Sequence, residues 1–114
     1  MDLDIQERGN ACAIKVKGPF KSPDSVRDFD KAVENTIASG HVNLVLDLSA
    51  MPMIDSSGIG AVVNALRRTR QMGGDVKLVD PSPFAQKTFK MVGILSLFQV
   101  YATTDEAIEA CTGG

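Results

Sequence analysis

Residues 44–60 read LVLDLSAMPMIDSSGIG and join a predicted strand to a predicted helix. The run Asn43–Leu48 is almost continuously apolar, which is typical of a strand buried on both faces of a sheet. From about Ser57 to Met72, apolar residues recur at intervals of three and four and predict an amphipathic helix; they are Ile59, Val62, Val63 and Leu66. A buried strand that leads through a loop into a helix is half of a strand–helix–strand unit, so we expect a parallel sheet.

The rest of the chain extends this alternation in both directions. Residues 3–8 and 11–17 predict a β-hairpin that turns at Gly9-Asn10. Strands are also predicted at 76–79 and 98–101, and further helices are expected to begin at Ser22-Pro23, at Ser82-Pro83 and at Thr103. The order β-β-α-β-α-β-α-β-α predicts one α/β domain over residues 1–114, with a mixed, mainly parallel sheet and an antiparallel hairpin at its amino end.

The composition argues against several classes of protein. The 114 residues carry 12 Lys and Arg against 14 Asp and Glu, a formal net charge of −2, which gives no general attraction for nucleic acid or an anionic membrane. No apolar run approaches the roughly 18 residues of a membrane span, and no signal peptide is visible at the start. We therefore expect a cytoplasmic protein that binds neither membranes nor nucleic acid.

Few residues are suited to catalysis or to holding a metal or a cofactor. The single histidine, His41, lies at the amino end of the buried strand and is assigned no function. Cys12 and Cys111 lack the spacing of metal ligands, and we expect a buried Cys12 and a free Cys111 rather than a disulfide. We therefore expect no enzymatic activity, no metal and no cofactor.

The loop of residues 49–57 follows the carboxyl end of the buried strand, where ligands and partners usually meet such a sheet. In the simplest interpretation the helix is capped by one of three adjacent residues, Asp55, Ser56 or Ser57. Two glycines follow at positions 58 and 60 and lower helix propensity by about 1 kcal/mol each relative to alanine. A protein tolerates them for close packing, or where another surface approaches the backbone. The segment Met51–Met53 fits either a contact surface or the core beneath the loop.

Three kinds of functional site fit such a loop unequally. A phosphate-binding loop is disfavoured, because residues 58–60 lack the third glycine of the dinucleotide fingerprint and no Gly-Lys-Ser/Thr follows. A nucleophile elbow would need a glycine where Ile54 stands. In the third kind, a serine accepts phosphate from another protein, and the helix N–H groups and macrodipole stabilise the phosphoryl group. Its charge of roughly −1.5 to −2 would lie beside Asp55 and change the surface that a partner meets.

Over almost the whole chain, and most strongly from Leu44 to Tyr101, the sequence resembles the STAS domain of bacterial anti-sigma factor antagonists. The most specific element is I-D-S-S-G at Ile54–Gly58, which follows a strand that ends in Leu-Asp-Leu. In this family the unphosphorylated antagonist binds an anti-sigma factor that is also a serine kinase with a histidine-kinase-like ATP fold. That binding releases a sigma factor or another client, and the antagonist itself performs no chemistry.

The resemblance also implies roles for residues of the loop. The kinase phosphorylates the first serine of the motif, here Ser56, the complex dissociates, and a metal-dependent serine phosphatase restores the active form. Asp55 is the acid beside the phosphoacceptor, and the rest of the docking edge is expected to consist of Ser57, Gly58 and Ile59. Nothing in the sequence demands more than a monomer.

One segment departs from the family pattern. Family members often carry an acidic Gly-Glu-Leu-Asp stretch after the second strand, whereas this chain has Gly18-Pro19-Phe20-Lys21. Because that loop is expected to lie near Ser56, Lys21 indicates a divergent kinase or a client other than a sigma factor. The alternative function is a STAS binding module that acts without phosphorylation, on a small apolar ligand or within a transporter-associated complex; the intact Asp-Ser-Ser-Gly motif argues against it.

Overall fold

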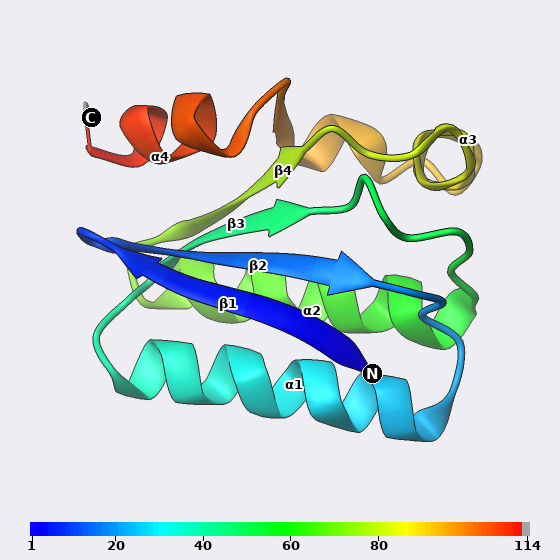
Figure 1. Ribbon diagram of the computed structural model, residues 1–114, viewed down its shortest axis with the longest axis horizontal. Helices are drawn as coiled ribbons and strands as arrows, with labels where there is room; N and C mark the ends of the chain where they lie inside the picture. Colours follow the sequence, from blue (N-terminus) through cyan, green and yellow to red (C-terminus); the bar gives the residue numbers. More distant parts are fainter. Residues whose placement is uncertain (113–114) are drawn as a thin grey trace.

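The computed structural model describes residues 1–112, so residues 113 and 114 of the expected domain lie outside the described residues. The elements follow the predicted order in a single α/β domain (Figure 1). The strands are β1 (Asp2–Arg8), β2 (Ala11–Lys17), β3 (Asn43–Asp47), β4 (Asp75–Val79) and β5 (Gln99–Tyr101). The helices are α1 (Pro23–Ala38), α2 (Ser56–Gln71), α3 (Pro83–Met91) and α4 (Thr104–Thr112), with a short 3₁₀ helix η1 at Leu95–Leu97.

The sheet has the spatial order β1-β2-β3-β4-β5. β1 pairs with β2 antiparallel through the turn at Gly9-Asn10, and β2, β3, β4 and β5 pair in parallel. The prediction of a mainly parallel sheet with an antiparallel hairpin is therefore confirmed. Parallel pairing brings the carboxyl ends of β2, β3 and β4 to one edge, where the loops before α1, α2 and α3 lie together (Figure 1).

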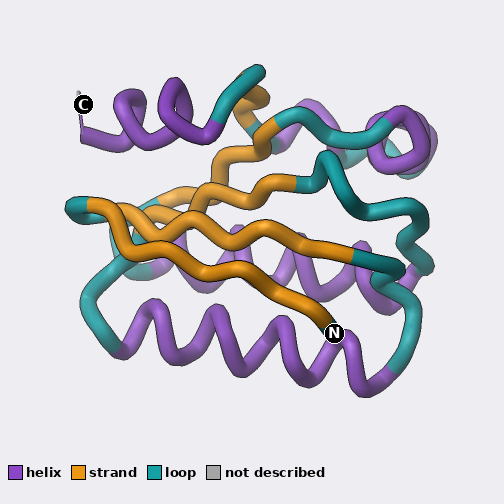
Figure 2. Tube along the Cα trace, in the orientation of Figure 1, coloured by secondary structure: helices purple, strands orange, loops and turns teal. Residues whose placement is uncertain are grey.

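Helices cover the two faces of the sheet unequally. α1 and α2 lie on one face and α4 lies on the other, as Figure 2 shows. Leu44 and Leu46 of β3 point into the larger core, which also receives Phe29 of α1, Val62 of α2 and Phe89 of α3. The residue between them, Val45, points into a smaller cluster with Ala107 and Ile108 of α4. All three β3 side chains are fully buried, which confirms a strand buried on both faces.

The segment between α3 and β5 differs from the prediction. α3 ends before Gly93, whose φ of 78° is left-handed, and the Ile94 N–H then bonds to the carbonyl of Phe89 at 2.9 Å. The chain forms η1 before it enters the sheet, and the Phe98 N–H donates to the Leu95 carbonyl at 3.2 Å. That bond holds Phe98 outside the ladder, so the strand begins at Gln99. Within residues 1–112, no helix has both the length and the apolar run that a membrane crossing requires.

Candidate phosphorylation and docking site

Asp55 is the residue that caps α2. Its backbone is extended, with φ −100° and ψ −175°, and its carboxylate accepts hydrogen bonds from the N–H groups of Ser57 at 3.0 Å and Gly58 at 3.1 Å. The Ser57 hydroxyl donates to the same carboxylate oxygen at 2.6 Å. The Ser57 hydroxyl first, and then the Gly58 N–H, lower the pKa of the Asp55 carboxyl, because both bond to its charged form. The capping interpretation is confirmed, and among the three candidates Asp55 is the cap.

The two serines that follow Asp55 have different environments. Ser56 is the first residue of α2 and is exposed, and its hydroxyl has no hydrogen-bond partner within residues 1–112. Ser57 is also exposed, but its hydroxyl is bound to Asp55. The structure therefore leaves one of the two hydroxyls unengaged at the surface, and it is the one that the resemblance assigns as phosphoacceptor.

The loop between β2 and α1 lies directly against the start of α2. The Phe20 N–H donates to the Met53 carbonyl at 2.9 Å, and the Asp55 N–H donates to the Phe20 carbonyl at 3.2 Å. Phe20 and Ile54 form an isolated parallel bridge between these bonds. Lys21 follows at once and is exposed. The expectation that this loop lies near Ser56 is thus confirmed, and Lys21 belongs to the same surface.

Gly58 and Gly60 have opposite surroundings. A Cβ at Gly58 would lie 2.6 Å from the Phe20 carbonyl oxygen and 2.7 Å from Cγ1 of Ile54, so only glycine fits there. A Cβ at Gly60 would meet no atom within 4 Å, and Gly60 is exposed. Close packing therefore accounts for Gly58 and leaves Gly60 without a role inside the domain.

The remaining predicted residues divide between surface and core. Ile59 is half-buried and packs against the large core beneath the proposed docking edge. Met51 is fully buried, and its carbonyl accepts a hydrogen bond from the Ser82 hydroxyl at 2.8 Å, so the core interpretation holds for it. Pro52 is exposed and Met53 is half-buried, and these two lie at the surface of the loop.

The residues best suited to chemistry do not assemble elsewhere in the described part of the chain. Among residues 1–112, no group of three or more His, Cys, Asp and Glu side chains has the spacing of a metal site. Cys12 and Cys111 are free thiols, and burial raises the pKa of both, which makes them less reactive. Nδ1 of His41 is buried without a hydrogen-bond partner. Metal or thiol chemistry therefore has no candidate centre in the described residues.

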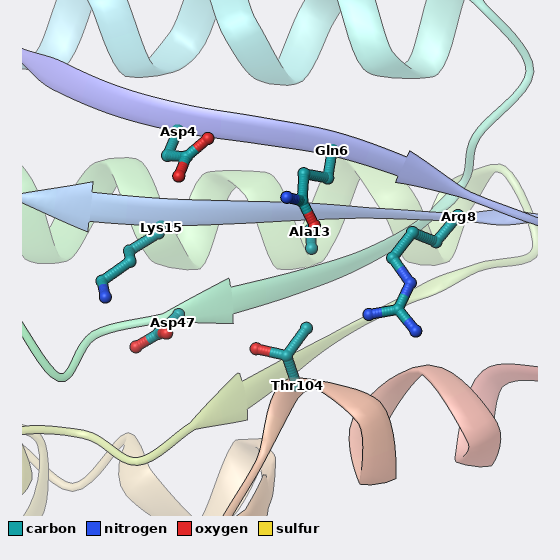
Figure 3. A pocket seen from close by; sticks show the side chains of 7 residues that line it. All are labelled: Asp4, Gln6, Arg8, Ala13, Lys15, Asp47 and Thr104. Atoms are coloured by element: carbon teal, nitrogen blue, oxygen red, sulfur yellow. The ribbon is translucent and has the colours of Figure 1, made fainter.

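A polar hollow of about 200 Å³ lies on the face of the sheet that α4 covers, between the hairpin, β3 and the start of α4 (Figure 3). Its charged groups are largely engaged with neighbours. Arg8 pairs with Asp105 at 2.7 Å, and the Asp47 carboxylate accepts from both the N–H and the hydroxyl of Ser49. The other side chains around the hollow are Asp4, Gln6, Ala13, Lys15 and Thr104. The lining contains no nucleophilic thiol and no imidazole, and it is separate from the start of α2.

The geometry of sheet, caps and loop agrees with the comparisons to known proteins. The sequence profile of the STAS domain family matches residues 2–107. The chain belongs to the STAS domain family. Among relatives, the anti-sigma F factor antagonist of Lysinibacillus sphaericus is 29% identical over 90 residues, which cover 78% of this chain and 76% of that protein. The one from Paenibacillus polymyxa is 22% identical over 98% of this chain and 93% of its own length.

Solved structures show how closely this STAS domain follows the fold. The structure of the anti-sigma factor antagonist SpoIIAA in its unphosphorylated form aligns with a TM-score of 0.86, with 23% identity over 99% of this chain and 98% of that one. At this identity the likeness concerns the fold. The likeness in fold extends over the order of strands and helices described above, which the sequence predicted.

Proposed function

We propose that this STAS domain is an anti-sigma factor antagonist that is switched by phosphorylation on Ser56. In its unphosphorylated form it binds an anti-sigma factor that is a serine kinase with a histidine-kinase-like ATP fold, and this binding releases the kinase's client. One observation carries the proposal: the Ser56 hydroxyl is exposed and unbonded at the start of α2, while Asp55 supplies the cap. The two relatives that are named anti-sigma F factor antagonists support it.

The electrostatics of the site explain how one phosphate would end the complex. The Asp55 carboxylate already occupies the N–H groups of Ser57 and Gly58, so a phosphoryl group on Ser56 would find these helix donors engaged. Since the pKa of Asp55 is lowered, this carboxylate is ionised at neutral pH. Phosphorylation therefore adds roughly −1.5 to −2 charges, and the bulk of a phosphoryl group, beside an existing negative charge. A partner surface shaped for the small Ser56 hydroxyl and the single charge of Asp55 no longer fits the modified site.

Lys21 gives this edge a charge of the opposite sign. It is exposed and directly follows Phe20, whose N–H and carbonyl bond to the loop before Ser56. A kinase that docks over Asp55 and Ser56 would meet Lys21 in the same contact. We infer that the cognate kinase places an acidic group opposite Lys21, and that this pairing distinguishes it from kinases that recognise an acidic loop.

In this exchange the chain is the substrate of the kinase and of the phosphatase, and it catalyses neither step. The kinase supplies ATP, its metal ion and a base that accepts the proton of the Ser56 hydroxyl. The Ser56 oxygen attacks the γ-phosphorus, and the bond between that phosphorus and the β,γ-bridging oxygen breaks to leave ADP. A metal-dependent serine phosphatase later hydrolyses the phosphate ester. The exchange takes place in the cytoplasm, with one copy of this chain in each complex.

The test is intact-mass spectrometry with peptide mapping. The purified chain is incubated with Mg-ATP and, one at a time, with the purified serine kinases of this ATP fold from its own organism. We expect one phosphate on Ser56, none on Ser56→Ala and one on Ser57→Ala. A phosphate only on Ser57 would contradict the assignment. Complex formation without any phosphate would instead support a binding module that acts without phosphorylation.

A further inference from the structure

We propose that the kinase's contact extends from Ser56 along one flank of α2, to a groove where Arg67 receives an acidic side chain of the kinase that lies next to an apolar one. This inference rests on the proposed function, because it takes the partner that reaches Ser56 as the occupant. It adds a second contact region about three turns away from the switch serine.

The flank is a straight line of surface positions on α2. Its residues are Ser56, Gly60, Val63, Arg67 and Arg70, which we call the α2 stripe. At 100° per residue these positions fall within about 40° of one line along the helix. The neighbouring Arg68 lies on a different side, where its charge acts on Asp30 of α1, whereas Arg70 donates to the Leu97 carbonyl of η1 at 2.9 Å. The α2 stripe is therefore turned away from α1 and is open to a partner.

Gly60 is the first observation that indicates a partner on the α2 stripe. It lies inside a helix, where glycine is less favourable than alanine, and its φ is not left-handed. A methyl group there would stand in open space, whereas one at Gly58 would clash with Phe20. The domain itself gains nothing from this glycine. A partner surface that packs closely on the backbone at Gly60 would explain why this position is glycine.

The groove beyond Gly60 shows what chemistry the partner would bring. It has a volume of about 420 Å³ and is lined by Val63, Leu66, Arg67, Arg70 and Gln71. Val63 is half-buried and Leu66 is nearly fully buried, so the floor is apolar while the rim carries guanidinium groups. An apolar side chain flanked by a carboxylate matches both features.

The two arginines of the groove have different roles. Arg70 is held in place by Asp75 at 3.2 Å and by the Leu97 carbonyl. Arg67 is exposed, and its one hydrogen bond within the described chain goes to the neutral amide of Asn64. The charge of Arg67 is therefore not balanced by any acid in residues 1–112. A guanidinium that has no acidic partner and lies beside an apolar floor is suited to pairing with a carboxylate.

The experiment measures stability and affinity on the same variants, with the kinase that phosphorylates Ser56 in the assay above as the probe. We expect Gly60→Ala to raise the melting temperature by about 4 °C, because alanine favours the helix, and to weaken binding of the kinase about tenfold. A gain in stability together with a loss of affinity is a combination that a purely structural role of Gly60 does not produce.

Charge reversal tests the groove itself. We expect Arg67→Glu to weaken binding about tenfold, because it places like charges together, and Arg27→Glu on α1 to leave the affinity unchanged as the matched control. If Gly60→Ala and Arg67→Glu both bind like the wild type while Ser56 is still phosphorylated, this inference fails and the proposed function stands. If no kinase binds or phosphorylates the wild type, both fail together.

Discussion

Three helices begin at the same edge of the sheet, and they do not begin in the same way. α1 and α3 each start with serine and proline, and the serine hydroxyl is the cap: Ser22 accepts from the Ser25 N–H at 3.0 Å, and Ser82 from the Ala85 N–H at 3.2 Å. α2 starts instead with an aspartate cap, and Ser56 comes after it. The serines of α1 and α3 are engaged in the fold, whereas Ser56 is not.

The difference shows how a fold can present a serine for modification without weakening itself. If Ser56 were the cap, a phosphate on its oxygen would remove the acceptor that satisfies the helix N–H groups. Because Asp55 takes that role, the helix keeps its cap whether or not Ser56 is modified. Substitutions at the three helix starts should therefore differ in their cost to stability.

Gly58→Ala should have the largest effect, because it separates the start of α2 from the loop that packs on it. The new Cβ would lie 2.6 Å from the Phe20 carbonyl oxygen, which is backbone and cannot move without disturbing the Asp55 N–H bond. We expect a loss of about 3 kcal/mol in the free energy of unfolding, measured by urea titration. A loss below about 0.5 kcal/mol would show that the two loops are not tightly joined.

Ser82→Ala should have the next largest effect, at the start of α3. It removes the hydroxyl that accepts from the Ala85 N–H at the helix start and that donates to the Met51 carbonyl at 2.8 Å. We expect a loss of about 2 kcal/mol, against about 1 kcal/mol for Ser22→Ala, which removes a cap but no bond to a distant loop. Equal losses in the two variants would contradict the role given to the Met51 bond.

Asp55→Asn should have a smaller effect that depends on pH. Asparagine also caps helices well, so the difference reflects the charge. The folded pKa of Asp55 is lowered, so its contribution is full above the unfolded value of about 3.9 and is lost as pH falls through the folded value. We expect the wild type to exceed Asp55→Asn in melting temperature at pH 7 and the gap to close as the pH falls below the lowered pKa of folded Asp55. A gap that stays constant would mean that the bonds to Asp55 do not favour its ionised form.

Ser56→Ala should have the smallest effect on stability. Its hydroxyl has no partner in the described chain, so we expect the free energy of unfolding to stay within about 0.5 kcal/mol of the wild type. The same variant should still bind the kinase but accept no phosphate. A loss as large as that of Ser22→Ala would show that Ser56 is a structural serine after all.

The sequence predicted the elements well because the signals for them are local. The apolar spacing of α2, the Ser-Pro starts of α1 and α3 and the Gly9-Asn10 turn each depend on a few neighbouring residues. Boundaries therefore agree to within about one residue. The hydroxyl of Thr103, where the last helix is predicted to begin, also accepts from the Glu106 N–H at 3.2 Å. The exception is η1, since a 3₁₀ turn carries no apolar period that sequence reading would detect.

The site was predicted less completely, because its details depend on contacts between distant segments. The sequence placed three capping candidates side by side, and only the tertiary arrangement selects Asp55 as the cap and leaves the Ser56 hydroxyl free. Gly58 and Gly60 look alike in the sequence, but only Gly58 packs against Phe20 and Ile54, which form a bridge between the two loops. No local pattern reports which of them the fold requires.

A calorimetric titration of one kinase with two forms of this chain, unmodified and phosphorylated on Ser56, tests directly whether Ser56 is a switch. We expect the unmodified chain to bind and the phosphorylated chain to bind about 100-fold more weakly or not at all, with both forms equally stable to heat. Equal affinities for the two forms would show that Ser56 is a modified residue but not a switch.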